Sequence, residues 1–191
     1  MQIGVFGGSF DPPHIAHIAV AAAAADVLAL DRVHFIPTFE QPFKPGKHVG
    51  SARARLDMVR VAVQCDPRFV ADGREVERGG TSYTVDTLRS LRRDFPGDEL
   101  SLLTGADTVR DLVQWRGAEE LPRLARIVVL SRPGAEALRT EVPVSYVEVP
   151  KIDVSATRIR ELISNAEPFR ELVPEAVADY IELHGLYRLG N

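Results

Sequence analysis

The sequence predicts an α/β fold in which a single doubly wound parallel sheet is flanked by helices. Apolar stretches of strand length alternate with helical stretches along the chain, as they do in βαβ units. Residues 100–104 and 127–131 are predominantly apolar, as buried strands of a parallel sheet are. The first apolar stretch, 2–6, runs into a glycine-rich turn that opens a helix. In such folds, ligands bind beyond the carboxyl ends of the strands.

The individual elements follow from the local pattern. Strands are expected where short apolar runs are bounded by turn residues, at 2–6, 33–37, 69–71, 75–77, 100–104, 127–131 and 144–149. Helices are expected where apolar residues recur at helical spacing, at 14–30, 52–65, 84–95, 106–113, 119–124, 155–164 and 174–184. Ser82 or Thr81 should cap the helix that begins at residue 84. The stretch 38–50, rich in proline and glycine, is predicted to be a loop.

Two helices carry more specific expectations. The alanine-rich helix 14–30 should pack its small side chains tightly against the sheet. Its apolar part is too short to span a bilayer, and no basic segment precedes it as in a signal peptide. In the helix 52–65, Leu56, Val59 and Val63 share one face, which should point to the core.

Composition restricts the class of protein and its partners. The 191 residues contain neither a repeat nor a linker, so residues 1–191 are expected to form one domain. The net charge of −4 argues against nucleic acid as a partner, although residues 44–60 are locally basic and suit a phosphorylated small molecule. The single cysteine, Cys65, excludes an internal disulfide, fits a reducing cytoplasm and should be a small buried residue. We expect a cytoplasmic protein without a membrane partner.

The turn after the first strand has the features of a phosphate cradle. Backbone N–H groups at a glycine turn and helix start attract anions, and His14 and His17, three residues apart, share one helix face. The spacing of the glycines fits neither the dinucleotide fingerprint nor the P-loop. Two alternatives remain: a plain glycine turn with incidental histidines, or a zinc pair. The zinc pair lacks patterned further ligands, since the remaining candidates are His34, His48, Cys65 and His184.

This stretch, Gly7-Gly8-Ser9-Phe10-Asp11-Pro12-Pro13-His14 with His17, resembles the nucleotidylyltransferase signature G-G-T/S-F-D-P-x-H-x-G-H. It departs from that signature at Ala16, where the family usually has glycine. The resemblance implies the nucleotidylyltransferase fold and an ATP site that includes Gly7, Gly8, Ser9, Phe10, His14 and His17.

A second segment, residues 154–160, offers hydroxyls at a helix start and an arginine one turn later. Alone, it is equally a capped helix with a solvated arginine. It resembles the family motif I-S-S-T-x-I-R, and this resemblance implies that Ser155, Thr157 and Arg160 also bind ATP. Together, the two motifs make His14, His17 and Arg160 the catalytic candidates.

The middle of the chain resembles one branch of that family, the bacterial nicotinate-nucleotide adenylyltransferases. Residues 79–88 resemble their S-Y-T-x-D-T-L segment, Gly105 and Asp107 with Trp115 resemble G-A-D…W, and residues 37–44 resemble their substrate loop. The resemblance implies that Gly105 and Asp107 bind ATP. It also implies a substrate site formed by Thr38, Lys44, Tyr83, Thr84, Trp115 and Arg116. Taken singly, Trp115 is more simply a core residue, and Tyr83 a helix start.

The implied activity is adenylyl transfer from ATP to nicotinate mononucleotide, giving nicotinate adenine dinucleotide and pyrophosphate. Mg²⁺ is expected to arrive on the ATP phosphates, because no carboxylate cluster marks a metal site of the protein's own. The alternatives are a pantetheine-phosphate adenylyltransferase, which shares the first and last motifs, and a nucleotide-binding domain without turnover. The sequence leaves open whether the chain forms a homo-oligomer.

Overall fold

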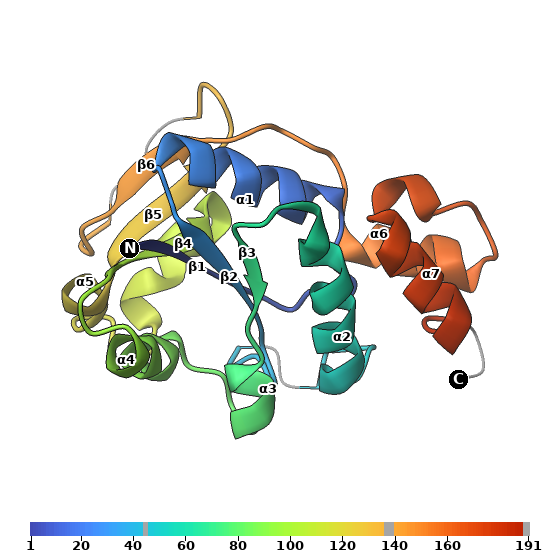
Figure 1. The fold of residues 1–191 in the computed structure, drawn as a ribbon, viewed down its shortest axis with the longest axis horizontal. Helices are drawn as coiled ribbons and strands as arrows, with labels where there is room; N and C mark the ends of the chain where they lie inside the picture. Colours follow the sequence, from blue (N-terminus) through green and yellow to red (C-terminus); the bar gives the residue numbers. More distant parts are fainter. Residues whose placement is uncertain (44–45, 136–139, 189–191) are drawn as a thin grey trace.

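The computed structural model of the chain describes residues 1–43, 46–135 and 140–188. Within these residues, six parallel strands form one sheet in the order β3-β2-β1-β4-β5-β6 (Figure 1). The strands are β1 (Gln2–Gly8), β2 (Arg32–Pro37), β3 (Phe69–Ala71), β4 (Glu99–Gly105), β5 (Arg126–Ser131) and β6 (Ser145–Glu148). The chain winds from β1 first to one edge and then to the other, which confirms the predicted doubly wound parallel sheet.

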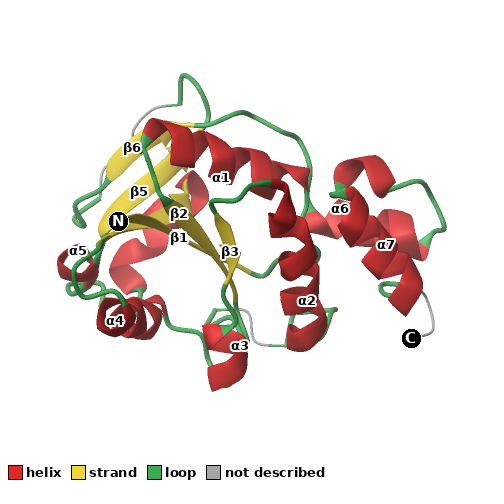
Figure 2. Cartoon of the chain, in the orientation of Figure 1, coloured by secondary structure: helices red, strands yellow, loops and turns green. Residues whose placement is uncertain are grey.

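Helices cover both faces of this sheet (Figure 2). The described α-helices are α1 (Ile15–Val27), α2 (Ala52–Ala62), α3 (Arg74–Arg78), α4 (Thr84–Asp94), α5 (Leu121–Leu124), α6 (Ala156–Ser164) and α7 (Glu175–His184). The described 3₁₀ segments are η1 (Val63–Cys65), η2 (Ala106–Gln114) and η3 (Arg170–Leu172). In Figure 1, α1 lies over one face and α4 and α5 over the other, while α6 and α7 lie beside α2 at one end.

The buried side chains form clusters that follow this arrangement. One cluster lies between the sheet and α1, a second joins the sheet to α4 and α5, and a third joins α2 to α6 and α7. In the first cluster Ala21, Ala24 and Ala25 are at most 1% exposed, so the expected packing of small side chains against the sheet is confirmed. Close approach of a helix to a sheet needs such small residues, because interiors are close-packed.

The helix predicted at 52–65 forms with its expected buried face. Leu56, Val59 and Val63 are all buried. The α-helix ends at Ala62, however, and continues only as the short η1. The expected burial of Cys65 is wrong: this thiol is exposed in the final turn, where it donates to the Ala62 carbonyl at 3.3 Å.

The strand predicted at 75–77 is wrong, because this stretch forms the short helix α3. The Asp72 carboxylate accepts a hydrogen bond from the Arg74 N–H at 3.0 Å, which starts the helical turn. Gly79, at φ +69°, ends it. Glu75 then turns inward and accepts the Thr87 hydroxyl at 2.5 Å, a contact with α4 that the alternating pattern of the sequence does not reveal.

The helix expected at 106–113 forms as the 3₁₀ segment η2, Ala106–Gln114. The expected cap of α4, in contrast, needs correction. The cap of α4 is Tyr83, without a side-chain hydrogen bond, whereas the Ser82 hydroxyl accepts the Phe39 N–H at 2.9 Å. Among the described residues, no helix combines the length and the apolar character needed to cross a membrane.

Candidate active site

The predicted phosphate-binding segments start at one edge of the sheet. Gly7 and Gly8 end β1, and Gly105 ends the neighbouring strand β4. Thr38 follows β2 and donates its N–H to the Gly8 carbonyl at 2.9 Å. Because the chain leaves β1 and β4 in opposite directions across the sheet, a crevice is expected here in a doubly wound fold.

Phe10 is a buried residue of the turn that follows β1. Its backbone has φ +47°, and the residue as a whole is 1% exposed, so its ring is part of the core. The Phe10 ring packs edge-on against His17, with the ring centroids 5.0 Å apart. A Cβ on Gly8 would lie 3.1 Å from the same ring, so a larger residue there would require the ring to shift by a few tenths of an ångström.

His14 and His17 lie together at the start of α1. Their rings stack with centroids 3.7 Å apart at an interplanar angle of 25°. His14 is the N-cap residue, in extended conformation, and its backbone N–H donates to Nδ1 of His17 at 3.1 Å. His14 Nδ1 is buried and has no hydrogen-bond partner within the described part of the chain. The predicted sharing of one face by these two rings is therefore confirmed.

The environment keeps both imidazoles neutral near pH 7. Burial lowers the pKa of His14 to about 4. Burial, and next the neighbouring His14, lower the pKa of His17 well below its ordinary value. Because Nδ1 of neutral His17 accepts a hydrogen bond, its proton is on Nε2, and the ring offers an N–H donor.

Arg160 links the motif at residues 154–160, called here the late motif, to the glycine-rich motif that follows β1. From α6 its guanidinium donates to the Asp11 carbonyl at 2.7 Å and to the Thr157 hydroxyl at 3.2 Å. Ser155 caps α6 by accepting the Arg158 N–H, and both Ser155 and Thr157 are exposed. The fold thus brings the two predicted motifs into direct contact.

The third predicted segment follows β4. Gly105 and Asp107 are exposed, at the end of the strand and in η2 respectively. The Thr108 hydroxyl donates to the Gly105 carbonyl at 2.7 Å and thereby holds the turn. The Asp107 carboxylate therefore lies at the surface, beyond the strand next to β1.

The residues predicted for the second substrate form a group of their own. Tyr83 and Trp115 are half-buried against the cluster that joins the sheet to α4. The Arg116 guanidinium lies over the Tyr83 ring, 4.7 Å from its centroid. Thr84 is the first residue of α4 and is half-buried. The structure thus gathers these aromatic and cationic groups at the start of one helix.

The remaining predicted substrate residues lie in the loop 38–50. Thr38 is half-buried, with its hydroxyl 3.5 Å from Nε2 of His48. Lys44 lies outside the described residues. The loop pairs with the segment before α4, because Ser82 donates its N–H to the Glu40 carbonyl at 2.9 Å. The loop is thereby joined to the group that contains Tyr83.

Residues 5–162 match the Cytidylyltransferase-like family. A Thermus thermophilus protein named "probable nicotinate-nucleotide adenylyltransferase" is 47% identical, over 98% of this chain and 100% of its own. A Herpetosiphon aurantiacus protein of the same name is 42% identical, over 97% and 98%. The chain belongs to the nicotinate-nucleotide adenylyltransferase family.

Solved structures agree at the level of the fold. Plasmodium falciparum nicotinic acid mononucleotide adenylyltransferase, complexed with NaAD, superposes with a TM-score of 0.76 at 16% identity. The match covers 97% of each chain. A structure of the same enzyme complexed with APC has a TM-score of 0.77 at 17% identity. The expected nucleotidylyltransferase fold is confirmed.

One buried group beside this family's signature belongs to none of the motifs. Arg55 is 0% exposed, although the sequence shows it only as part of the basic stretch 44–60. Its position relative to Val59 and Ala62, four and then three residues further on, places it on the buried face of α2. This helical spacing is the feature of the sequence that indicates the burial of Arg55. Arg53 and Arg60, in contrast, pair with Asp57 at the surface.

No set of three His, Cys, Asp or Glu side chains in the described parts of the chain is arranged to hold a metal ion. The two histidines of the signature stack on each other, and one of the four ring nitrogens already accepts a backbone N–H. The structure therefore gives the zinc alternative no support.

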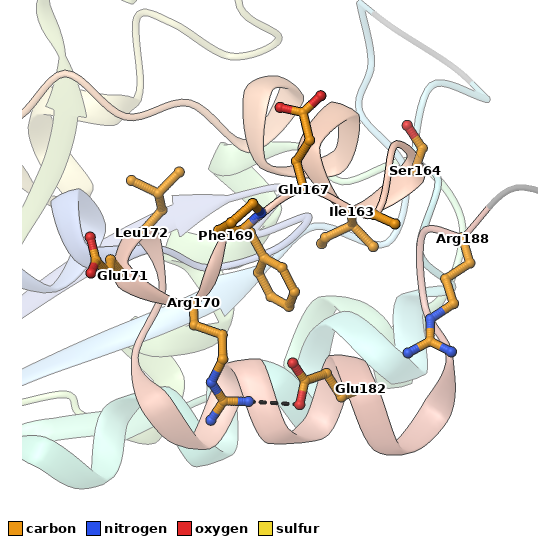
Figure 3. A pocket seen from close by; sticks show the side chains of 11 residues that line it. Ile163, Ser164, Glu167, Phe169, Arg170, Glu171, Leu172, Glu182 and Arg188 are labelled. Carbon is orange, nitrogen blue, oxygen red and sulfur yellow. Dashed lines mark hydrogen bonds and ion pairs between the residues drawn. The ribbon is translucent and has the colours of Figure 1, made fainter.

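A pocket of about 930 Å³ lies elsewhere, between α6, η3 and α7 (Figure 3). Phe169 lines it, and Arg170 pairs with Glu182 across it at 2.7 Å. None of the predicted site residues is among its lining residues. This pocket is separate from the candidate active site.

The neutrality of His14 predicts a stability that depends on pH. An unfolded chain takes up a proton at His14 below its ordinary pKa of 6.5, but the folded protein does so only near pH 4. Stability is therefore lost as pH falls between these values, by up to about 3 kcal/mol. Urea unfolding at pH 7 and pH 4 should show a larger loss for wild type than for His14→Gln. Carboxylate protonation affects both proteins equally, so parallel pH curves would contradict a neutral buried His14.

Proposed function

We propose that this family member transfers the adenylyl group of ATP to nicotinate mononucleotide, releasing pyrophosphate. The observation that supports this best is the direct contact between the signature motif at residues 7–17 and the late motif at residues 154–160. Arg160 donates to the Asp11 carbonyl at 2.7 Å, in the same turn that leads to the paired imidazoles of His14 and His17. Cationic and N–H donors that converge beyond β1 suit a triphosphate. The name shared by the bacterial relatives supports the same activity.

The chemistry needs alignment more than a base. A phosphate oxygen of nicotinate mononucleotide forms a bond to the α-phosphorus of ATP. The bond from that phosphorus to the bridging oxygen breaks, and the electron pair leaves with pyrophosphate. The attacking phosphate dianion is already deprotonated, so positioning and charge stabilisation account for the catalysis.

Each candidate residue has a role in this proposal. Nε2–H of His17 donates to a phosphate oxygen, His14 lies stacked on it, and Arg160 neutralises charge that develops on the leaving group. ATP enters as its magnesium complex, because the described residues offer no metal cluster of their own. The backbone of residues 7–10, with Gly105, Asp107, Ser155 and Thr157, would complete the ATP site.

The pyridine nucleotide would occupy the group at the start of α4. Trp115 stacks on the ring, while the first N–H groups of α4 and the Arg116 guanidinium meet the carboxylate. The nearby Asp86 is engaged by both Arg89 and Arg116. Thr38 and Lys44 of the loop 38–50 would meet the phosphate and ribose. A single cysteine in the chain favours a cytoplasmic enzyme.

The direct test is pyrophosphate release from ATP with three acceptors in turn: nicotinate mononucleotide, nicotinamide mononucleotide and phosphopantetheine. A carboxylate satisfies a pocket of N–H donors, whereas an amide NH₂ leaves a buried donor unpaired at about 1–3 kcal/mol. We expect kcat/KM for the acid to exceed that for the amide by at least roughly tenfold. Equal rates would contradict the acid-specific pocket. Turnover with phosphopantetheine alone, or with none of the three, would contradict the proposed activity.

His17→Ala should abolish most turnover and leave the fold intact. Removing one preorganised donor to a transition-state charge costs roughly a hundred- to thousand-fold in kcat. His184→Ala is the matched control, since His184 is exposed on α7 and should leave kcat unchanged. A folded His17→Ala protein with wild-type kcat would exclude this helix start as the reaction centre.

Trp115→Ala should weaken nicotinate mononucleotide far more than ATP. Loss of aromatic stacking costs about 1–3 kcal/mol, and adenine is expected to lie near the late motif instead. Isothermal titration of each ligand measures this difference, and Trp115→Phe should restore most of the affinity. Equal losses for both ligands would assign Trp115 to the core alone.

A further inference from the structure

Arg55 is a fully buried arginine whose partners are backbone carbonyls. From α2 its Nη1 donates to Ser9 O at 2.8 Å, its Nη2 to Phe39 O at 3.1 Å and its Nε to Gly50 O at 3.2 Å. Its side chain is 0% exposed. A buried cation is costly unless it is hydrogen-bonded, and here each of the three guanidinium nitrogens donates to a carbonyl.

The three carbonyls belong to two separate parts of the site. Ser9 lies in the turn between β1 and α1 that carries the family signature, residues 7–14, called here the signature turn. This turn is on the proposed ATP side of the site. Phe39 and Gly50 lie at the two ends of the loop 38–50, which is the proposed mononucleotide side. One guanidinium therefore holds both ends of this loop and fastens them to the turn.

The same junction is reinforced by the neighbouring Asp11. Its carboxylate accepts the Val49 N–H at 2.8 Å and the Gly50 N–H at 2.9 Å, so Gly50 is held through both its N–H and its carbonyl. A Cβ on Gly50 would lie 2.7 Å from the Asp11 carboxylate. A larger residue at this position would therefore have to displace the Asp11 carboxylate.

We propose that Arg55 is a positioning residue that closes the base of the loop 38–50 and sets its distance from the signature turn. This inference rests on the proposed function, because that distance then determines how the acceptor phosphate meets the α-phosphorus. Arg55 touches neither substrate. Lysine cannot replace it, because a single ammonium lacks the planar fork that reaches three carbonyls in fixed directions.

The consequence is a separation of binding from turnover. When Arg55 is lost, the ATP site and the mononucleotide site each keep their own residues, but the two sites are no longer held at a fixed distance from each other. A misplacement of about 1 Å far from the chemistry can cost on the order of a hundredfold in rate. We expect Arg55→Lys to lower kcat at saturating substrates by at least about tenfold. The Kd of ATP alone, measured by titration, should change by less than about threefold.

The matched control is Arg60→Lys on the same helix, since Arg60 is exposed and pairs only with Asp57 among the described residues. It should leave both kcat and Kd unchanged. A folded Arg55→Lys protein with wild-type kcat would overturn the proposal, even if its Tm were lower. So would a parallel loss of ATP affinity and turnover, which indicates general damage.

Hydrogen exchange on the wild-type protein tests whether the base of the loop 38–50 is closed, without a variant. The amides of Val49 and Gly50 should exchange at least about a hundredfold more slowly than unprotected amides, because both are bonded to Asp11. Unprotected amides there would overturn a closed loop base. A wild-type protein that is inactive with nicotinate mononucleotide would defeat the proposed function alone, and the exchange result would still show whether the loop base is closed.

Discussion

The hydrogen bonds of Asp11 join parts of the chain that lie far apart in sequence. Its carboxylate accepts from the end of the loop 38–50 and from the Tyr187 hydroxyl at 2.8 Å, and its carbonyl accepts from Arg160. Tyr187 follows α7 and Arg160 lies on α6, so both C-terminal helices are hydrogen-bonded to Asp11. Burial, and next the Asp11 carboxylate, raise the pKa of Tyr187, which keeps its hydroxyl protonated as a donor.

This arrangement explains how a site made of weak individual interactions is preorganised. The signature turn packs against aromatic rings, because Phe10 in the turn contacts both Phe6 and Phe35. The rings of Phe6 and Phe10 contact His17 and exclude water from one side of it. This burial lowers the pKa of His17, so its imidazole is a neutral N–H donor that needs no counter-ion. Preorganised donors in a desolvated setting stabilise charge more than the same donors in water, because no reorganisation is needed during reaction.

The proposed mononucleotide side is built around a second buried network. Phe39 donates to the Ser82 hydroxyl, and Glu75 accepts the hydroxyl of Thr87. Burial raises the pKa of Glu75, and the hydrogen bonds from Thr87 and Ser82 oppose this shift. These contacts join α3, α4 and the loop 38–50, so the start of α4 is placed by groups that lie outside every recognised motif.

Local patterns in the sequence were enough to determine the doubly wound sheet, the pair of histidines on one face of α1 and the presence of the late motif. Those features depend on residue spacing and on glycine, which act over a few positions. The sequence mispredicts α3 and the cap of α4, because contacts with other elements hold Glu75 on Thr87 and Ser82 on Phe39. It mispredicts the burial of Cys65 because α2 ends at Ala62 and the thiol lies in the short exposed turn that follows. The buried charge of Arg55 and the junction at Asp11 were decided only by the tertiary structure. A buried charge is tolerated only where distant groups satisfy it, and spacing along the chain does not record which groups those are.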